Sequence, residues 1–244
     1  MSGAADDDMI YREIVRKQTF YEVSLLEYAA SLISERKGLV LDVGANIGNH
    51  SVYLGTFATD HLISVEPNPI VLPALRANLK ANAVDATLIE KGLGAEAGRA
   101  SVVENTEYPD NYGMAALATG NGTIEIVTLD SVVADWRSQT TSDVPVTLIK
   151  IYVEGMELDV LRGATETLTR DRPDLLIEAA TRTHVDALTA HLAPLGYASV
   201  GHFAATPVHH FSPSPSRKAA SRARWHKIKG DTKRKLRSLR RLAS

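Results

Sequence analysis

The stretch from Val40 to His50, Val-Leu-Asp-Val-Gly-Ala-Asn-Ile-Gly-Asn-His, constrains the fold of this chain more than any other. An apolar run ending at Asp42 is typical of a strand buried on both faces, and residues 51–55 continue as a helix. Between them Gly44 and Gly48 permit positive φ and let a ligand approach the backbone. Asp42 can accept hydrogen bonds from a cationic or NH-bearing ligand. The pattern indicates an α/β fold with a ligand-binding turn, although such turns also occur without a ligand.

The glycine spacing differs from the G-x-G-x-x-G fingerprint of dinucleotide-binding proteins, which disfavours a dehydrogenase. The pattern of Asp42, Gly44, Asn46 and Gly48 resembles motif I of class I S-adenosylmethionine methyltransferases, and Leu-Asp-Val-Gly-Ala-Asn-Ile-Gly resembles the FkbM family of them. This resemblance implies a doubly wound, Rossmann-like α/β fold, with a mostly parallel seven-stranded sheet and antiparallel closing strands. It also implies S-adenosylmethionine as cofactor, bound in part by these four residues, with its amino-acid end near Asp42.

A second acid ends the next apolar run. Glu66 lies 24 residues after Asp42 and is followed by Pro67 and Asn68. In nucleotide-binding α/β folds an acid at about this offset binds ribose, because one carboxylate can accept from two vicinal hydroxyls. We therefore expect Glu66, with Pro67 and Asn68, to bind the cofactor; a surface acid at a strand end is the alternative. Gly92, after the third strand, is expected to contact the adenine ring.

Residues 146–155 are the second informative segment. The stretch Lys-Ile-Tyr-Val-Glu-Gly, ending at Gly155, resembles the Lys-Ile-Asp-Val-Glu-Gly of the FkbM family, so Tyr152 stands where the family carries aspartate. A phenol with an ordinary pKa of about 10 is neutral at pH 7 and a poor ligand for a hard metal ion. Three explanations compete: a subfamily that uses tyrosine, a binding protein that has lost catalysis, and a substitution introduced on purpose.

The resemblance covers residues 11–211 and implies an S-adenosylmethionine-dependent O-methyltransferase. Its acceptor would be a hydroxyl of a sugar, glycolipid, polysaccharide or polyketide-like molecule. Methyl transfer requires an aligned acceptor oxygen and the removal of a proton. Glu154 and Glu178, each near a strand end, are the candidate bases, and Tyr152 is the third catalytic candidate. His50 is either another base or a packing residue. The rival functions are a catalytically silent S-adenosylmethionine-binding protein and an RNA-directed methyltransferase.

The sequence assigns no metal ligands, although a divalent metal remains open as a cofactor. His202, His209 and His210 lack a carboxylate at ligand spacing, so we expect them to be solvent-facing strand residues. His184 and His191, on a predicted helix, are also expected at the surface.

Two further segments are expected beside the cleft. Tyr21 and Glu22 resemble a tyrosine–glutamate pair of the family, the alternative being an amphipathic helix whose polar side chains face water. Residues 100–104 and 123–128 are predicted to form an inserted pair of strands, joined by a polar loop over residues 105–122. Long polar loops beside a cleft are suited to acceptor recognition.

Residues 1–9 are predicted to be disordered, residues 10–37 to form a helical cover, and residues 38–211 to form the methyltransferase domain. Residues 212–216, Ser-Pro-Ser-Pro-Ser, are predicted to be a linker. Residues 217–244 hold 12 of the 27 Lys and Arg residues and a single acid. This basic tail could contact an anionic surface such as a membrane or nucleic acid, dock on the acidic domain, or remain a solvated extension.

Composition sets the remaining limits. A chain of 244 residues with 44% hydrophobic content can bury one α/β core. It has no cysteine, which excludes disulfides, thiolate zinc sites and a cysteine nucleophile. No apolar run approaches the roughly 18 residues that span a bilayer, and the first residues do not resemble a secretory signal. We therefore expect a cytoplasmic protein; the oligomeric state is not indicated.

Overall fold

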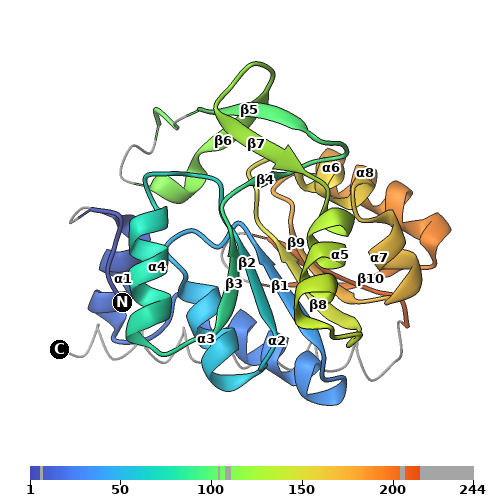
Figure 1. Ribbon diagram of the computed structural model, residues 1–244, viewed down its shortest axis with the longest axis horizontal. Coiled ribbons are helices and arrows are strands. Elements are labelled where there is room, and N and C mark those ends of the chain that lie inside the picture. Colours follow the sequence, from blue (N-terminus) through green and yellow to red (C-terminus); the bar gives the residue numbers. More distant parts are fainter. Residues whose placement is uncertain (6–7, 104, 108–110, 204–206, 215–244) are drawn as a thin grey trace.

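The centre of the fold is a seven-stranded sheet with strand order β10-β11-β9-β8-β1-β2-β3 (Figure 1). The computed structural model describes residues 1–5, 8–103, 105–107, 111–203 and 207–214. Parallel pairing joins β1 (Leu39–Val43), β2 (Leu62–Val65), β3 (Ala86–Ile89), β8 (Val146–Ile151) and β9 (Asp174–Glu178). Two antiparallel strands, β11 (Val208–Ser212) and β10 (Ala198–Phe203), close the sheet beyond β9. The predicted fold class is confirmed.

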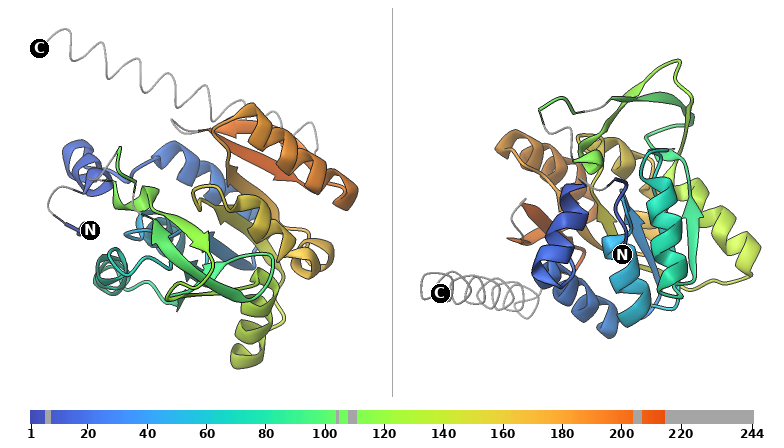
Figure 2. Two further views of the ribbon diagram at one scale, coloured as in Figure 1. Left: turned by 90° about the horizontal axis from the view of Figure 1, so that it is seen from above. Right: turned by 90° about the vertical axis from the view of Figure 1, so that its left-hand side faces the viewer.

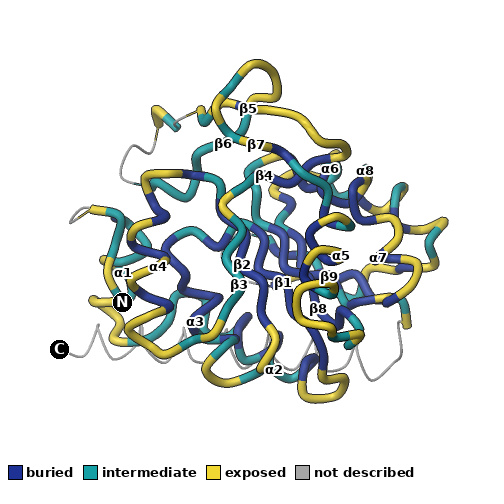
Figure 3. Tube along the Cα trace, viewed as in Figure 1, coloured by how far each residue is buried: buried dark blue, intermediate teal, exposed yellow. Residues whose placement is uncertain are grey.

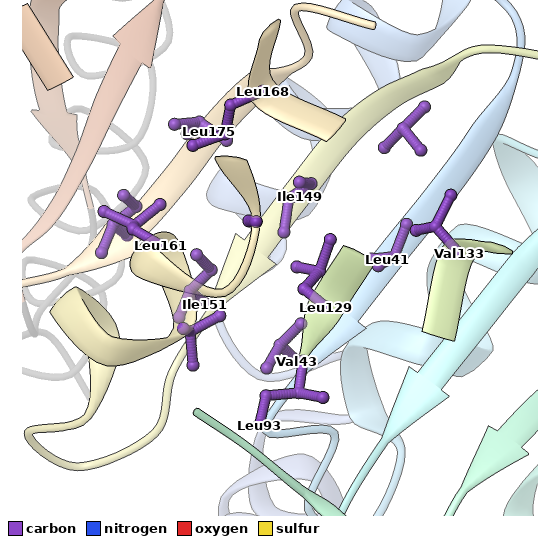
Figure 4. Close-up of a cluster of buried hydrophobic side chains, with 14 of the residues drawn as sticks. Leu41, Val43, Leu93, Leu129, Val133, Ile149, Ile151, Leu161, Leu168 and Leu175 are labelled. Atoms are coloured by element: carbon purple, nitrogen blue, oxygen red, sulfur yellow. The ribbon is translucent and has the colours of Figure 1, made fainter. Parts of the chain in front are cut away.

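Helices cover both faces of this sheet because alternate side chains of the central strands point to opposite faces. Leu41 and Val43 pack with helices on one face (Figure 4), which are α5 (Leu129–Thr140), α6 (Glu157–Arg162), α7 (Thr165–Arg170) and α8 (Arg182–Leu192). Val40 packs on the other face, against α2 (Val23–Glu35). Helices α3 (Asn49–Phe57) and α4 (Leu72–Ala81) form an adjoining apolar cluster. The central strands are consequently the most deeply buried part of the chain (Figure 3).

A second, four-stranded sheet stands over the carboxyl ends of the central strands (Figures 1 and 2). Its order is β4-β7-β5-β6, comprising β4 (Gly92–Leu93), β5 (Gly98–Val103), β6 (Ala116–Thr119) and β7 (Ile124–Val127). The sequence predicted β5 and β7 as an inserted pair. It missed β4 and β6, because a two-residue strand and the segment Ala-Leu-Ala-Thr carry no clear period of two.

The N-terminal segment differs from the prediction of disorder over residues 1–9. The Ser2 N–H donates to Asn78 Oδ1 (2.6 Å), and Asn78 Nδ2 donates to the Ser2 carbonyl (2.7 Å). Asp8 then begins α1 (Met9–Lys17) by accepting from the Tyr11 N–H (2.9 Å). A buried amide on α4 thus gains partners from the N-terminus, which the local sequence does not reveal.

Smaller differences concern helix lengths. The one or two helices predicted over residues 10–33 are two, α1 and α2, and α7 was not predicted. Ser212, assigned to the linker, ends β11, while the basic tail of residues 217–244 lies outside the described residues. Among the helices that the structure describes, none has the length and apolar character needed to cross a membrane.

Candidate active site

The turn after β1 has the left-handed backbone that its glycines predicted. Gly44, Asn46 and Gly48 have φ of 77°, 50° and 87°. A Cβ atom on Gly44 would lie 1.7 Å from the Tyr152 carbonyl oxygen, and one on Gly48 would lie 2.7 Å from Leu75 Cδ1. Gly44 is therefore required by packing as well as by φ, because the end of β8 lies directly against the turn, whereas Gly48 is favoured mainly by its φ.

A cavity of about 440 Å3 opens at this carboxyl edge of the sheet. Of the predicted site residues, its lining includes Gly44, Asn46, Glu66, Tyr152, Glu154 and Glu178. A smaller cavity of about 40 Å3 adjoins it, and its lining includes Pro67, Asn68 and Gly92. Gly44, Glu66 and Tyr152 line both, so the two cavities are neighbours that share part of their walls. The size of the larger cavity falls within the range of small-molecule sites.

Glu66 is held rigidly at the junction of the two cavities. Its Oε2 accepts from the Asn46 N–H (2.8 Å) and its Oε1 from the Asn68 N–H (2.9 Å). Burial raises the pKa of Glu66, and these two backbone hydrogen bonds oppose that rise. Asn68 Nδ2 in turn donates to the Tyr112 carbonyl (3.2 Å), which connects the inserted segment to this acid. Each carboxylate oxygen keeps a further lone pair for a ligand.

Asp42 is not placed as the sequence predicted. Its side chain is fully buried, and neither cavity, as the described residues define them, includes it. Ser51 Oγ donates to its Oδ2 (2.6 Å), and the Lys150 ammonium lies 3.0 Å from its Oδ1. Lys150 also donates to the carbonyls of Gly44 (2.7 Å) and Val43 (3.3 Å). Asp42 therefore acts on the turn through Lys150, which sequence reasoning matched to the family without a role.

Glu22 lies at the cavity. The alternative prediction, that its side chain faces water, is wrong. Only 4% of the Glu22 side chain is exposed. Its Oε2 accepts from the Tyr152 hydroxyl (3.2 Å) and lies 3.6 Å from His50 Nε2. Burial raises the pKa of Glu22 to about 7, against the lowering effects of Tyr152 and Lys150. The Asn49 side chain fixes this corner by bonding both the N–H and the carbonyl of Tyr21 (2.9 and 3.0 Å).

The catalytic candidates share this acid-rich wall. Burial and the neighbouring Glu154 raise the pKa of Glu178, at the end of β9, to about 7. Burial and then Glu157 raise the pKa of Glu154, whose φ of 52° places it in a tight turn after β8. Burial and the charges of Glu22 and Glu178 raise the pKa of Tyr152 well above 10. Tyr152 is therefore a neutral phenol that donates a hydrogen bond.

Two residues at the cavity were not predicted there. Glu157, on α6, accepts from the N–H groups of Val153 and Gly155 (3.2 Å each). His184 was expected at the surface, but it lines the cavity with Nε2 3.2 Å from Glu157 Oε2. The position of His184 in the helix that follows β9 is the signal that could have indicated it, since such helices start at the carboxyl edge.

Two further histidines, His50 and His210, can be compared with their predicted positions. His50 lies at the cavity, and burial and the nearby Lys150 lower its pKa to about 3, which makes it a neutral and weak base. His210 is fully buried, contrary to expectation: its ring bonds the Tyr28 hydroxyl (2.7 Å) and Asp174 (2.8 Å). In the described part of the chain no group of three or more acidic, histidine or cysteine residues is arranged to hold a metal ion.

The inserted segment forms the far wall of the cavity. Asn111, Gly113 and Met114 line it, as do Met9 and Ile10 of the N-terminal segment. A Cβ atom on Gly113 would lie 2.3 Å from the Asn46 amide nitrogen, so this loop rests directly on the glycine turn. The predicted position of the loop beside the cleft is therefore confirmed, whereas its role in acceptor recognition stays a prediction.

A doubly wound sheet with a ligand-sized cavity at its carboxyl edge is the arrangement of nucleotide- and cofactor-binding α/β proteins. The sequence model of the FkbM methyltransferase domain matches residues 42–197, so the chain belongs to the FkbM methyltransferase family.

The individual proteins and structures that resemble this chain have low sequence identity to it. The chain is 29% identical over 136 residues to the hexuronic acid methyltransferase AglP of Haloferax volcanii, which covers 55% of this chain and 53% of that protein. The chain thus spans about half the length of this curated relative. The solved FkbM methyltransferase of Methylobacillus flagellatus is 20% identical, with a TM-score of 0.49 over 72% of this chain and 43% of that one. A precorrin-6y C5,15-methyltransferase of Geobacter metallireducens gives 16% and 0.48, over 80% and 88%.

Proposed function

We propose that this protein is an S-adenosylmethionine-dependent O-methyltransferase whose acceptor is a hydroxyl of a sugar or sugar-containing molecule. The observation that carries the proposal is the pair of adjoining cavities at the carboxyl edge, lined by a fixed acid after β2 and by further acids after β8 and at the end of β9. Membership of the family and the sugar acid in the name of the Haloferax relative support a carbohydrate acceptor. Glycolipids and polysaccharides belong to this acceptor class, whereas the polyketide-like acceptor that the sequence also allowed does not.

The residues present fit the proposed cofactor. Glu66 offers a rigid carboxylate with free lone pairs to two vicinal hydroxyls of a ribose. Pro67, Asn68 and Gly92 line the smaller cavity beside it, where the base of a nucleoside would lie. Asn46 adds a buried Oδ1 without a hydrogen-bond partner among the described residues. An unsatisfied acceptor at a cavity wall is costly unless a ligand supplies a donor.

The chain's own residues would align the acceptor and remove its proton. When bound, the cofactor supplies an electrophilic methyl group on a sulfonium. We assign the base to Glu178, because its pKa of about 7 lets it take the hydroxyl proton near neutral pH. Glu178 would hold the proton that the acceptor hydroxyl loses when its oxygen takes the methyl group. Glu154 is the second candidate, and Tyr152 shapes the pocket between them.

Calorimetry tests the cofactor assignment. Titration with S-adenosylhomocysteine should give micromolar affinity and titration with NAD none, because the site lacks a dinucleotide glycine pattern. Glu66→Ala should weaken the binding of S-adenosylhomocysteine at least about tenfold, since two hydroxyl hydrogen bonds to a charged group are lost. Glu96→Ala, at an exposed position, is the matched control. Affinity for NAD alone, or no effect of Glu66→Ala, would contradict the proposal.

Glu178→Gln tests the base. It should lower kcat about 100-fold or more, while the affinity for S-adenosylhomocysteine changes less than about threefold. The wild-type kcat/KM should rise with pH and level off above about 7, as the carboxyl group loses its proton. Transfer of a labelled methyl group to a panel of neutral sugars measures both. Binding of the cofactor without transfer in the wild type would instead favour the catalytically silent alternative.

A further inference from the structure

One carboxyl group at the cavity has a hydrogen-bond partner among the described residues for only one of its two oxygens. Glu22 has a side chain that is 4% exposed, and its Oε2 accepts from the Tyr152 hydroxyl. Its Oε1 is buried and has no hydrogen-bond partner among the described residues. Leaving a buried carboxylate oxygen without a donor costs free energy, so the missing donor is expected from a ligand. Glu22 lines the cavity, so its carboxyl group lies at the cavity wall.

The order of the strands defines which part of a ligand would reach Glu22. Parallel strands β8, β1 and β2 are adjacent, and Gly44, after β1, lies between the ends of the other two. Glu66 follows β2, and Tyr152, which bonds Glu22, follows β8. Consider a nucleoside that would bind Glu66 through its sugar and would point its base to Gly92. Its 5′ substituent would then extend across Gly44 toward Glu22.

Two other charged groups are excluded by their contacts and a third by its position, while Glu157, whose buried Oε2 also has no hydrogen-bond partner among the described residues, has His184 Nε2 3.2 Å from that oxygen. Asp42 is enclosed by Ser51 and Lys150 and is absent from the cavity lining that the described residues define. The Lys150 ammonium has three oxygen neighbours, on Asp42, Val43 and Gly44, so its donors are already used. Glu178 lies at the end of β9, one strand further from Glu66 than β8.

We propose that Glu22 binds the α-ammonium group of the methyl donor through its free Oε1. This inference rests on the proposed function, since it assumes that the nucleoside is S-adenosylmethionine. A carboxylate suits this task because an ammonium group donates three hydrogen bonds and carries the opposite charge. The Asn49 side chain, which bonds both backbone groups of Tyr21, holds the preceding residue and so positions Glu22 over the amino terminus of α3. In this arrangement Asp42 orders the turn and Glu22 takes the contact that Asp42 was predicted to make.

Three ligands separate the ammonium contact from the rest of the nucleoside. S-adenosylhomocysteine carries both the amine and the carboxyl group, its decarboxylated analogue keeps only the amine, and 5′-methylthioadenosine has neither. Glu22→Gln retains the size of the side chain and an oxygen for the Tyr152 hydroxyl but loses the charge. Calorimetry on the full chain should show a loss of about 10- to 100-fold for the first two ligands and less than about twofold for the third. Glu178→Gln and Glu96→Gln are the matched controls, and neither should discriminate among the ligands.

Each other outcome overturns a defined part of the proposal. An unchanged affinity of Glu22→Gln for S-adenosylhomocysteine would refute the contact, as would an equal loss for all three ligands, which would indicate general damage to the cavity. A loss specific to amine-bearing ligands in Glu178→Gln would move the ammonium site to that acid. If the wild type binds none of the three nucleosides, both this inference and the proposed function fail; if it binds them without discrimination by Glu22→Gln, only this inference fails.

Discussion

At the scale of single residues, the partners of each carboxyl group decide its role. Asp42 is neutralised by Lys150, Glu66 is held by two backbone N–H groups, and Glu22 and Glu178 keep a raised pKa of about 7. The sequence placed three of these four acids at strand ends, which was sufficient to predict where they gather. It could not distinguish their roles, because Lys150, the ion-pair partner of buried Asp42, comes from a strand more than 100 residues later.

Glu22→Gln should change the pH dependence of stability. The pKa of Glu22 in the folded chain is about 7, above the 4.5 of an exposed glutamate, so the folded state binds this proton more tightly than the unfolded state. The contribution of Glu22 to stability is therefore fully present below pH 4.5 and is lost as the pH rises through about 7. Between pH 4.5 and about 7 the unfolding free energy of the wild type should therefore fall further than that of Glu22→Gln, by at most on the order of 3 kcal/mol. Urea denaturation of both proteins at pH 5 and pH 8 measures these free energies. An equal change between the two pH values in the wild type and in Glu22→Gln would contradict the assignment.

At the scale of elements, the site depends on one close approach, between the turn after β1 and the end of β8. The strands of the main sheet could be predicted because apolar runs and terminal acids mark them clearly. The inserted segment and the pair Tyr21 and Glu22 were also predicted beside the cleft, but the contacts that hold them there, such as those between Asn49 and Tyr21, could not be predicted. Nothing in the local pattern of either segment specifies its distant partner.

Gly44→Ala tests this close approach. A Cβ atom there would lie 1.7 Å from the Tyr152 carbonyl oxygen, and the φ of 77° is unfavourable for alanine. We expect a loss of about 3 kcal/mol or more in unfolding free energy, measured by urea denaturation, because β1 and β8 would have to separate. Gly98→Ala, where a Cβ would meet nothing within 4 Å, should change it by less than about 1 kcal/mol. Equal effects of the two substitutions would refute the packing argument.

At the scale of the whole molecule, the cavity has a wall rich in acidic side chains. Glu22, Glu66, Glu154, Glu157 and Glu178 line it, and Lys150, the one Lys or Arg among its described lining residues, is already bound by three oxygens. This distribution comes from segments spread over most of the chain; the sequence predicted Glu66, Glu154 and Glu178 at the site but not Glu157.

This wall should select acceptors by charge. A carboxylate on the acceptor would lie among like charges with no free cation to pair with, so a neutral hexose derivative should have at least about a tenfold higher kcat/KM than the matching uronic acid. Methyl transfer to the two sugars at equal donor concentration measures this ratio. Preference for the uronic acid would refute the electrostatic argument and would bring the acceptor closer to the hexuronic acid named for the Haloferax relative.

The N-terminal wall has a practical consequence for domain borders. Met9, Ile10, Tyr21 and Glu22 belong to the cavity, yet all of them precede the segment of residues 42–197 that defines the family. A fragment trimmed to those family borders would lose α2, which covers one face of the main sheet, and the part of the cavity wall that precedes residue 42. Ligand screens, chimeras and expression clones that start at the family border would therefore examine a different binding surface from the one that the complete fold presents.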